Sequence, residues 1–240
     1  MADELEMLRI HVEAVWGVRL PALDAGDVTV ALESVAPPWS LYMGTLASGL
    51  VRIWRRDVAA HERAGLVKRA LAALAPPAET PNSEDAGREV ALRRVEASQI
   101  NVTLASRLAR RLTIADTELL DEFEENSASY YLAPERAPVF GVVEQGRLVS
   151  VAHSSRRTAE ACELGVETAP DARTRGYALA VTVLWAEAVA AEGIEPIYSA
   201  LAENTASLAL AHAAGYRPFV RSVYLRSARP PARGEITPRR

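Results

Sequence analysis

The sequence predicts a mixed α/β fold, in which helices flank a central mixed sheet, together with an additional α/β region at the N-terminal end. Apolar runs with strand alternation and longer helical stretches follow one another along the second half of the chain. Hydrophobic residues make up 49% and charged residues 24% of the 240 residues, which is ordinary for a globular protein with a substantial core.

Residues 8–54 read mostly as strands and turns, and one helix is expected after them. Residues 28–32 and 50–54 alternate between apolar and polar side chains, as strands do. A helix is expected after Asp57, whose side chain can cap it, and Pro76-Pro77 end it.

Residues 76–87 are the best linker in the chain because they contain three prolines together with Asn82, Ser83 and Gly87. A weaker helix is expected to begin at Ser83 or Asp85, and a strand at 100–104 follows it. These features predict four parts: an N-terminal α/β region of unknown role (1–80), a linker and helix (81–99), the main domain (100–226) and a tail rich in proline and arginine (227–240).

The second half carries clearer signals. Thr113 and Asp116 have the spacing of a capping box, which predicts a helix directly after them. Two apolar runs around Gly146 predict a β-hairpin. The remaining expected elements, in chain order, are a strand (161–168), a helix (179–191), a short strand (196–200), a helix (205–214) and a last strand (219–225).

Composition argues against several classes of protein. A net charge of −4 gives no reason to expect nucleic-acid binding, and the only cysteine, Cys162, cannot form an intrachain disulfide. The four histidines form no metal-like cluster. The acidic N-terminus lacks the basic start of a signal peptide, and no apolar run is long enough to span a bilayer. A soluble cytoplasmic protein without a membrane partner is expected.

The most informative segment is Arg173-Thr174-Arg175-Gly176-Tyr177-Ala178, between an expected strand and an expected helix. The first-turn N–H groups of a helix lack partners within the helix and carry the positive end of its dipole. Gly176 allows close approach of an anion, and two arginines add positive charge. The segment therefore predicts a phosphate site. Ordinary surface arginines are the alternative.

With this order of elements, Arg173-x-x-Gly176-x-Ala178 resembles the R/Q-x-x-G-x-G/A signature of the GNAT superfamily of N-acetyltransferases. The segment Glu163–Arg173 is similar to a V-E-T-x-P-x-x-R subgroup of that superfamily. Downstream, Asn204-x-x-Ser207-x-x-Leu210 and then Gly215-Tyr216 resemble its second motif. The resemblance covers about residues 100–226 and is faint over 1–80.

The resemblance implies that acetyl-coenzyme A is the cosubstrate. In the family, the turn binds the pyrophosphate, and free backbone groups of the preceding strand pair with the pantetheine arm. Asn204 matches the family's asparagine near the pantetheine, although it could also be only a helix cap. The implied cofactor-binding residues are Val166, Thr168, Arg173, Thr174, Arg175, Gly176, Tyr177, Ala178, Asn204 and Ser207.

Acetyl transfer to an amine requires a proton acceptor, and a carboxylate can serve. Glu163 and Glu167 are the catalytic candidates, because alternation places both on one face of the strand. Gly165 between them would leave room for a substrate. The alternative is that they are solvated strand carboxylates.

The family often has a tyrosine acid seven residues after the asparagine, and Ala211 occupies that position here. The subgroup often has alanine there too, so Ser207, Tyr198 or water could protonate the leaving thiolate. The expected function is an N-acetyltransferase that acts on a small-molecule amine. A non-catalytic acyl-coenzyme A-binding module and a protein N-terminal acetyltransferase remain alternatives, and the sequence leaves open the acceptor and a homodimer.

Overall fold

The computed structural model describes residues 4–23, 26–30, 37–74 and 86–226. The chain divides into two compact units, each built from separate segments. The N-terminal unit comprises residues 1–91, 200–204 and 218–240, and the C-terminal unit comprises 92–199 and 205–217. This division differs from the one expected from the sequence, because most of the last strand belongs to the N-terminal unit.

The N-terminal unit is a sheet with a helix on each face. Its strands run in the order β1-β3-β2-β10-β4, and β2 pairs antiparallel with both β3 and β10. Its elements are α1 (Glu4–Trp16), β1 (Gly26–Thr29), β2 (Trp39–Leu46), β3 (Gly49–Trp54), α2 (Ala60–Leu74), β4 (Ala86–Arg94) and β10 (Tyr216–Arg226).

Alternation along β2 separates the two cores of this unit. Tyr42 packs with Leu8 and Val12 of α1, whereas Met43 packs in a second cluster with Ala70 of α2. The two helices therefore cover opposite faces of the sheet.

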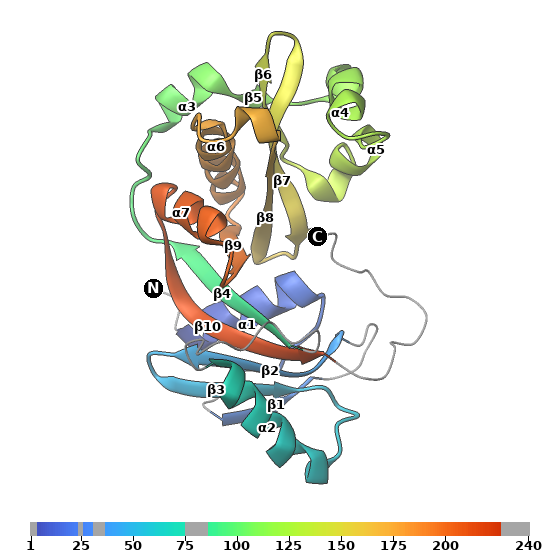
Figure 1. The fold of residues 1–240 in the computed structure, drawn as a ribbon, viewed down its shortest axis with the longest axis vertical. Coiled ribbons are helices and arrows are strands. Elements are labelled where there is room, and N and C mark those ends of the chain that lie inside the picture. Colours follow the sequence, from blue (N-terminus) through green and yellow to red (C-terminus); the bar gives the residue numbers. More distant parts are fainter. Residues whose placement is uncertain (1–3, 24–25, 31–36, 75–85, 227–240) are drawn as a thin grey trace. The chain divides into compact units, whose positions relative to one another are not determined.

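The C-terminal unit is a sheet with the strand order β9-β8-β7-β6-β5, in which only β8 and β9 are parallel. Helices α3 and α6 lie on one side of β6–β8, and α4 and α5 lie on the other (Figure 1). Its elements are α3 (Val102–Leu108), β5 (Arg110–Arg111), η1 (Ile114–Asp116), α4 (Thr117–Phe123), α5 (Ala128–Tyr131), η2 (Pro134–Arg136), β6 (Phe140–Glu144), β7 (Arg147–Arg157), β8 (Ala161–Thr168), η3 (Pro170–Ala172), α6 (Tyr177–Ala191), β9 (Glu195–Leu201) and α7 (Thr205–Ala213).

Most predictions for the second half are confirmed. The Thr113–Asp116 capping box is present and opens η1, after which α4 follows. The hairpin of β6 and β7 turns through Gln145 and Gly146, which have φ of 52° and 80°. Strand β8, helices α6 and α7 and strands β9 and β10 all form within a few residues of their expected bounds.

Several predictions for the first half are wrong. Residues 4–16 form a helix, although strands and turns were expected from residue 8 onward, and residues 86–94 form β4 in place of a weak helix. In β4 the side chains of Val90, Ala91 and Leu92 are all buried, as in a strand covered on both faces. The expected helix starts at Ser83 and Asp85 lie outside the described residues.

Two local capping details also differ. The expected strand at 100–104 is the start of α3, because Asn101 Oδ1 accepts a hydrogen bond of 2.9 Å from the Leu104 N–H and caps the helix. Helix α2 forms as expected but begins at Ala60, and Asp57 accepts a hydrogen bond of 2.6 Å from Arg55 Nε.

No helix among the described segments is both long and apolar enough to cross a lipid bilayer.

Candidate functional site

The turn between β8 and α6 has the backbone geometry expected of an anion site. Gly176 has φ of 81° and precedes α6 with no side-chain cap on the helix. A Cβ atom at Gly176 would meet no atom within 4 Å, so the space over the turn is open. Thr174 has φ of 64°, an unfavourable conformation for a β-branched residue. Such strain is found more often where a backbone segment binds a ligand.

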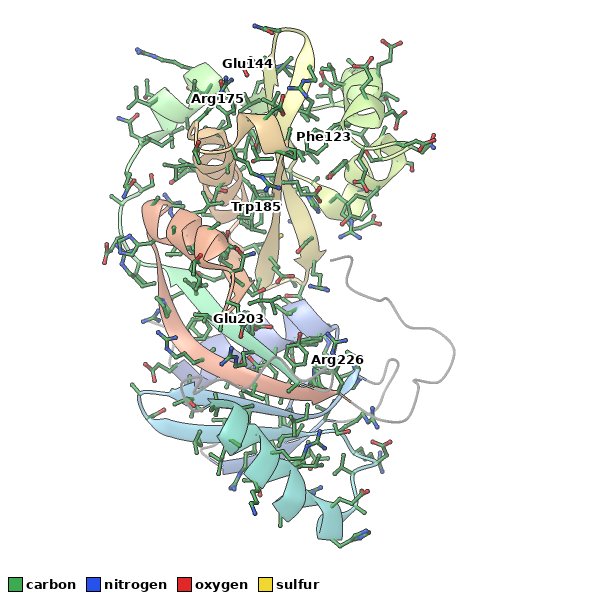
Figure 2. The ribbon with its side chains drawn as sticks, viewed as in Figure 1. Phe123, Glu144, Arg175, Trp185, Glu203 and Arg226 are labelled. Carbon is green, nitrogen blue, oxygen red and sulfur yellow. The ribbon has the colours of Figure 1, made fainter. Side chains whose placement is uncertain are left out.

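The two arginines of the turn differ in their surroundings. Arg175 lies close to Glu144 of β6 (Figure 2) and forms an ion pair of 2.7 Å with it. The Glu144 carboxylate also accepts a hydrogen bond from Tyr177. Arg173 donates through Nε to the carbonyl oxygen of Thr168 at 3.4 Å and is exposed. Arg175 thus lies beside a carboxylate, whereas the hydrogen bond of Arg173 goes to a backbone carbonyl.

Strands β8 and β9 separate directly before this turn. Their parallel pairing consists of three residue pairs and ends at Glu163 and Ile197, although β8 continues to Thr168. Along the described part of β8, Val166 and Thr168 keep their pairing with β7 but have no ladder partner on β9. Unpaired backbone groups at such a strand edge can bind an extended ligand.

The gap between the strands and the open turn fit an extended cosubstrate that carries phosphate groups, as coenzyme A does. Backbone groups near Val166 and Thr168 would hold its arm, and the amides at the start of α6 would hold its phosphates. The strand edge at Val166 and Thr168 and the turn at Gly176 both lie within the C-terminal unit.

Glu163 is buried, with 5% of its surface exposed. Its Oε2 accepts hydrogen bonds from Ser155 Oγ at 2.9 Å and from Arg156 Nη1 at 2.7 Å. Its Oε1 accepts one from Ser199 Oγ of β9. Because it is buried and bonded in this way, Glu163 is not the solvated carboxylate of the alternative reading. It connects β7, β8 and β9 at the point where β8 and β9 separate.

Glu167 is exposed, unlike Glu163. Its charge, with that of Glu124, adds to burial in raising the pKa of the Tyr131 hydroxyl, so that hydroxyl stays protonated at neutral pH. Tyr131 itself is fully buried. Of the two predicted bases, Glu167 is the one that a solvent-borne amine could reach.

The space beside Gly165 is occupied by His153, so the expectation of free room for a substrate there is wrong. A Cβ atom at Gly165 would lie 2.4 Å from His153 Cε1. The imidazole is 3% exposed and packs edge-on against the rings of Tyr130 and Tyr131. Burial, and after it the charge of Arg136, lowers the pKa of His153 to about 4, so it is neutral at pH 7.

Sequence reasoning missed Tyr130, Tyr131 and Arg136, which join His153 and Glu167 on one face of the sheet. Tyr130 Oη lies 3.2 Å from His153 Nε2, and the Arg136 guanidinium carbon lies 4.3 Å from the centre of the Tyr130 ring. We name these five residues the His153 cluster. Two adjacent tyrosines were the visible signal, but no local pattern places them against β7.

Tyr198 and Ser207 are joined across β9 and α7. Tyr198 is the first residue of β9 after the last pair with β8, and its Oη lies 2.9 Å from Ser207 Oγ. Burial raises the pKa of Tyr198, and the Ser207 hydrogen bond lowers it in part. Ala211, one turn along α7, is fully buried. A tyrosine hydroxyl therefore lies next to α7 even though Ala211 carries none.

Asn204, Cys162 and the possible metal ligands remain to be placed in the structure. Asn204 is exposed directly before α7, and its backbone N–H donates to Leu201 O at 2.9 Å. Burial raises the pKa of the Cys162 thiol to about 11, which suits the buried strand residue expected there. Among the residues that the structure describes, no group of three or more His, Cys, Asp or Glu side chains could hold a metal ion.

Comparison with known proteins identifies the family. The sequence model described as GNAT acetyltransferase matches residues 79–221, more than half of the chain. The chain therefore belongs to the GNAT acetyltransferase family, and its mixed sheet flanked by helices is the fold predicted from the sequence. The V-E-T subgroup stays a prediction. A comparison with curated proteins found no match.

Solved structures of GNAT proteins are similar to the chain at low identity. A GNAT-family protein from Novosphingobium aromaticivorans is 21% identical with a TM-score of 0.47, over 65% of this chain and 71% of that one. An acetyltransferase from Colwellia psychrerythraea is 16% identical with a TM-score of 0.48, over 60% and 58%. A GCN5-related N-acetyltransferase-like protein from Streptococcus suis is 15% identical with a TM-score of 0.43, over 74% and 71%. These values are too low to carry over a substrate.

Proposed function

We propose that the protein is an acetyl-coenzyme A-dependent N-acetyltransferase that acts on a small amine. The observation that supports this best is the separation of β8 from β9 beside the open, uncapped turn at Gly176. Acetyl-coenzyme A would supply an acetyl group activated as a thioester. The chain's own residues would then bind it, accept a proton from the amine and return a proton to the sulfur.

Glu167 would be the proton acceptor. It is the exposed carboxylate of the pair, whereas Glu163 already accepts hydrogen bonds from three side chains. As the amine nitrogen bonds to the acetyl carbon and the carbon–sulfur bond breaks, the amine proton would pass to Glu167, directly or through water.

The Tyr198 hydroxyl, bonded to Ser207, would protonate the leaving thiolate. Burial keeps this hydroxyl protonated, so it can donate at neutral pH. This assignment places the acid on β9 and leaves Ala211 as a packing residue.

The cosubstrate assignment is tested by calorimetric titration of coenzyme A into the wild type, Gly176→Asp and Gly193→Asp. Both glycines have positive φ, of 81° and 77°, and neither has an atom within 4 Å of the added Cβ. The two variants therefore carry similar backbone strain, but only Gly176→Asp puts a carboxylate at the start of α6. We expect Gly176→Asp to abolish binding and Gly193→Asp to retain it. Absence of binding by the wild type would refute the proposal.

Turnover is measured as thiol release with a panel of small amines. We expect Glu167→Gln to lower kcat by about 100-fold with an unchanged coenzyme A affinity. Tyr198→Phe should lower kcat without raising the KM for acetyl-coenzyme A. If both variants keep wild-type kcat, the assigned base and acid are wrong.

A second candidate function is acyl-coenzyme A binding without catalysis. It is favoured by Ala211 at the position where the resemblance places a tyrosine acid. Under this function, coenzyme A binds with the same dependence on Gly176, but no amine of the panel is acetylated.

A further inference from the structure

Arg136 stands apart from the other arginines of the C-terminal unit. Most of those arginines form an ion pair with a carboxylate: Arg94–Glu187, Arg110–Asp116, Arg147–Asp171, Arg156–Glu163, Arg157–Glu192, Arg175–Glu144 and Arg217–Glu96. Arg107, Arg111 and Arg173 are exposed. Burial raises the pKa of the Glu195 carboxyl and the charge of Arg93 lowers it in part, so Arg93 also lies near a carboxylate. Arg136 is half-buried, and no carboxylate among the described residues pairs with it.

The contacts of Arg136 hold its guanidinium in place without neutralising it. Nη1 donates to the carbonyl oxygen of Ser155, and the guanidinium carbon lies 4.3 Å from the centre of the Tyr130 ring. Nε is buried and has no hydrogen-bond partner among the described residues. Removing a charged group from water without a counter-charge is costly, so this arrangement favours an anion supplied from outside the chain.

This cation lies on the same face of the sheet as the proposed base. Ser155, which holds it, stands at the irregularity in β7 between Ser154 and Arg156 and also bonds to Glu163. The guanidinium of Arg136 stacks on the Tyr130 ring, and the Tyr130 hydroxyl lies 3.2 Å from His153 Nε2. His153 is paired with Gly165, which is two residues from Glu167 along β8. Two strand residues span roughly 7 Å, so Gly165 and Glu167 are about that far apart along β8.

We propose that the acceptor is an amine that also carries a carboxylate, such as an amino acid or a short peptide, and that Arg136 binds this carboxylate. The inference rests on the proposed N-acetyltransferase function and names its acceptor class. The planar guanidinium matches a carboxylate with two parallel hydrogen bonds, and Glu167 would attract the ammonium form of the amine. An acceptor with both charges therefore complements the opposite charges of Arg136 and Glu167.

The competing explanation is that Arg136 has only a structural role and stabilises the packing around β7 through its contacts with Ser155 and Tyr130. In that case its removal would harm every acceptor equally, because the whole face would shift. A preference between matched acceptors distinguishes the two roles.

The experiment compares kcat/KM for matched acceptors that differ in one group. Each amino acid of a panel, including glycine, β-alanine and glycylglycine, is paired with its carboxamide. Aminomethylphosphonate is added as a second anion. The proteins are the full-length wild type, Arg136→Gln, Arg136→Lys and the control Arg107→Gln, which removes an exposed charge on α3.

We expect the wild type to prefer at least one acid over its amide by 10-fold or more. Arg136→Gln should lower kcat/KM for that acid by about 100-fold, mainly by raising KM. The same substitution should change kcat/KM for the matching amide by less than about 3-fold. Arg136→Lys should have a kcat/KM for that acid between those of the wild type and Arg136→Gln, because lysine keeps the charge but cannot donate two parallel hydrogen bonds. Arg107→Gln should behave as the wild type.

Equal activity on acids and amides, or an equal loss on both in Arg136→Gln, would overturn the inference while the turnover itself upholds the proposed function. A preference for aminomethylphosphonate over every carboxylate would also overturn it. No acetylation of any acceptor by the wild type would overturn the proposed function and the inference with it. Calorimetry with coenzyme A then tells a binding module from a protein that does not bind coenzyme A.

Discussion

The close contact between Gly165 and His153 predicts that one methyl group changes stability in opposite directions in two backgrounds. A Cβ atom at Gly165 would lie 2.4 Å from His153 Cε1 and 2.6 Å from Nε2. Carbon atoms in ordinary contact are about 3.5–4.0 Å apart, so Gly165→Ala must move the ring by more than about 1 Å.

The imidazole cannot move freely because Tyr130 and Tyr131 pack against it, with ring centroids at 5.4 and 5.0 Å. Overpacking of this kind costs roughly 1–3 kcal/mol, and loss of the Tyr130 hydrogen bond adds about 1 kcal/mol. Replacing a strand glycine returns about 0.5–1 kcal/mol through backbone entropy. We therefore expect Gly165→Ala to lower the free energy of unfolding by about 2 kcal/mol.

In a His153→Ala background the ring is absent, and the same methyl group has room. Only the smaller loss of backbone entropy on folding then remains. Gly165→Ala should therefore raise the free energy of unfolding by about 0.5 kcal/mol or more relative to His153→Ala alone. Urea denaturation followed by circular dichroism measures all four proteins. If Gly165→Ala has the same sign of effect in both backgrounds, the contact does not govern the packing of this face.

Three further predictions concern stability. Burial lowers the pKa of His153 to about 4, below its ordinary value, so folding favours the neutral imidazole. The contribution of His153 to the free energy of unfolding is therefore present above pH 6.5 and is lost as the pH falls toward 4. By pH 4.5 the wild type should lose about 2 kcal/mol more than His153→Gln in urea titrations, and parallel losses would contradict this. Gly215→Ala, whose Cβ would lie 2.2 Å from Glu96 O at φ of 88°, should cost more than about 3 kcal/mol, against about 1 kcal/mol for Gly193→Ala, where the space is open. Comparable costs for the two alanines, from thermal and urea unfolding, would rule out the close backbone approach. Glu163→Ala should cost about 2–3 kcal/mol because it removes the carboxylate that accepts from Arg156 and Ser199 and leaves Ser155 only the backbone carbonyl of residue 163. Glu96→Ala, in an exposed pair with Arg217, should cost less than about 1 kcal/mol. A small loss for Glu163→Ala would show that its network contributes little.

The parts of the fold that could be predicted are those with local causes. The Thr113–Asp116 capping box and the hairpin at Gly146 depend on residues only a few positions apart. The β8 strand and the turn at Gly176 were likewise visible, because a strand, a glycine and a helix follow one another directly.

The parts that could not be predicted depend on distant partners. The helix at 4–16 buries His11 and Glu13, and His11 pairs at 2.8 Å with Glu89 of β4, so its polar residues hide its amphipathic pattern. The His153 cluster depends on the register that sets His153 opposite Gly165 and on the packing of Tyr130 against His153. No spacing in the sequence reports these contacts.

The pairing of β10 with β2 affects how the chain can be made and divided. Leu41 pairs with Leu225, so the N-terminal unit cannot complete its sheet until the ribosome has released nearly all of the described chain. During synthesis, β2 has an uncovered edge while the C-terminal unit is being made, which makes it a site for wrong pairing. A fragment cut after residue 91 would keep that edge permanently and should aggregate. The two units therefore have separate internal contacts, but the N-terminal unit can fold completely only after the C-terminal unit has been synthesised.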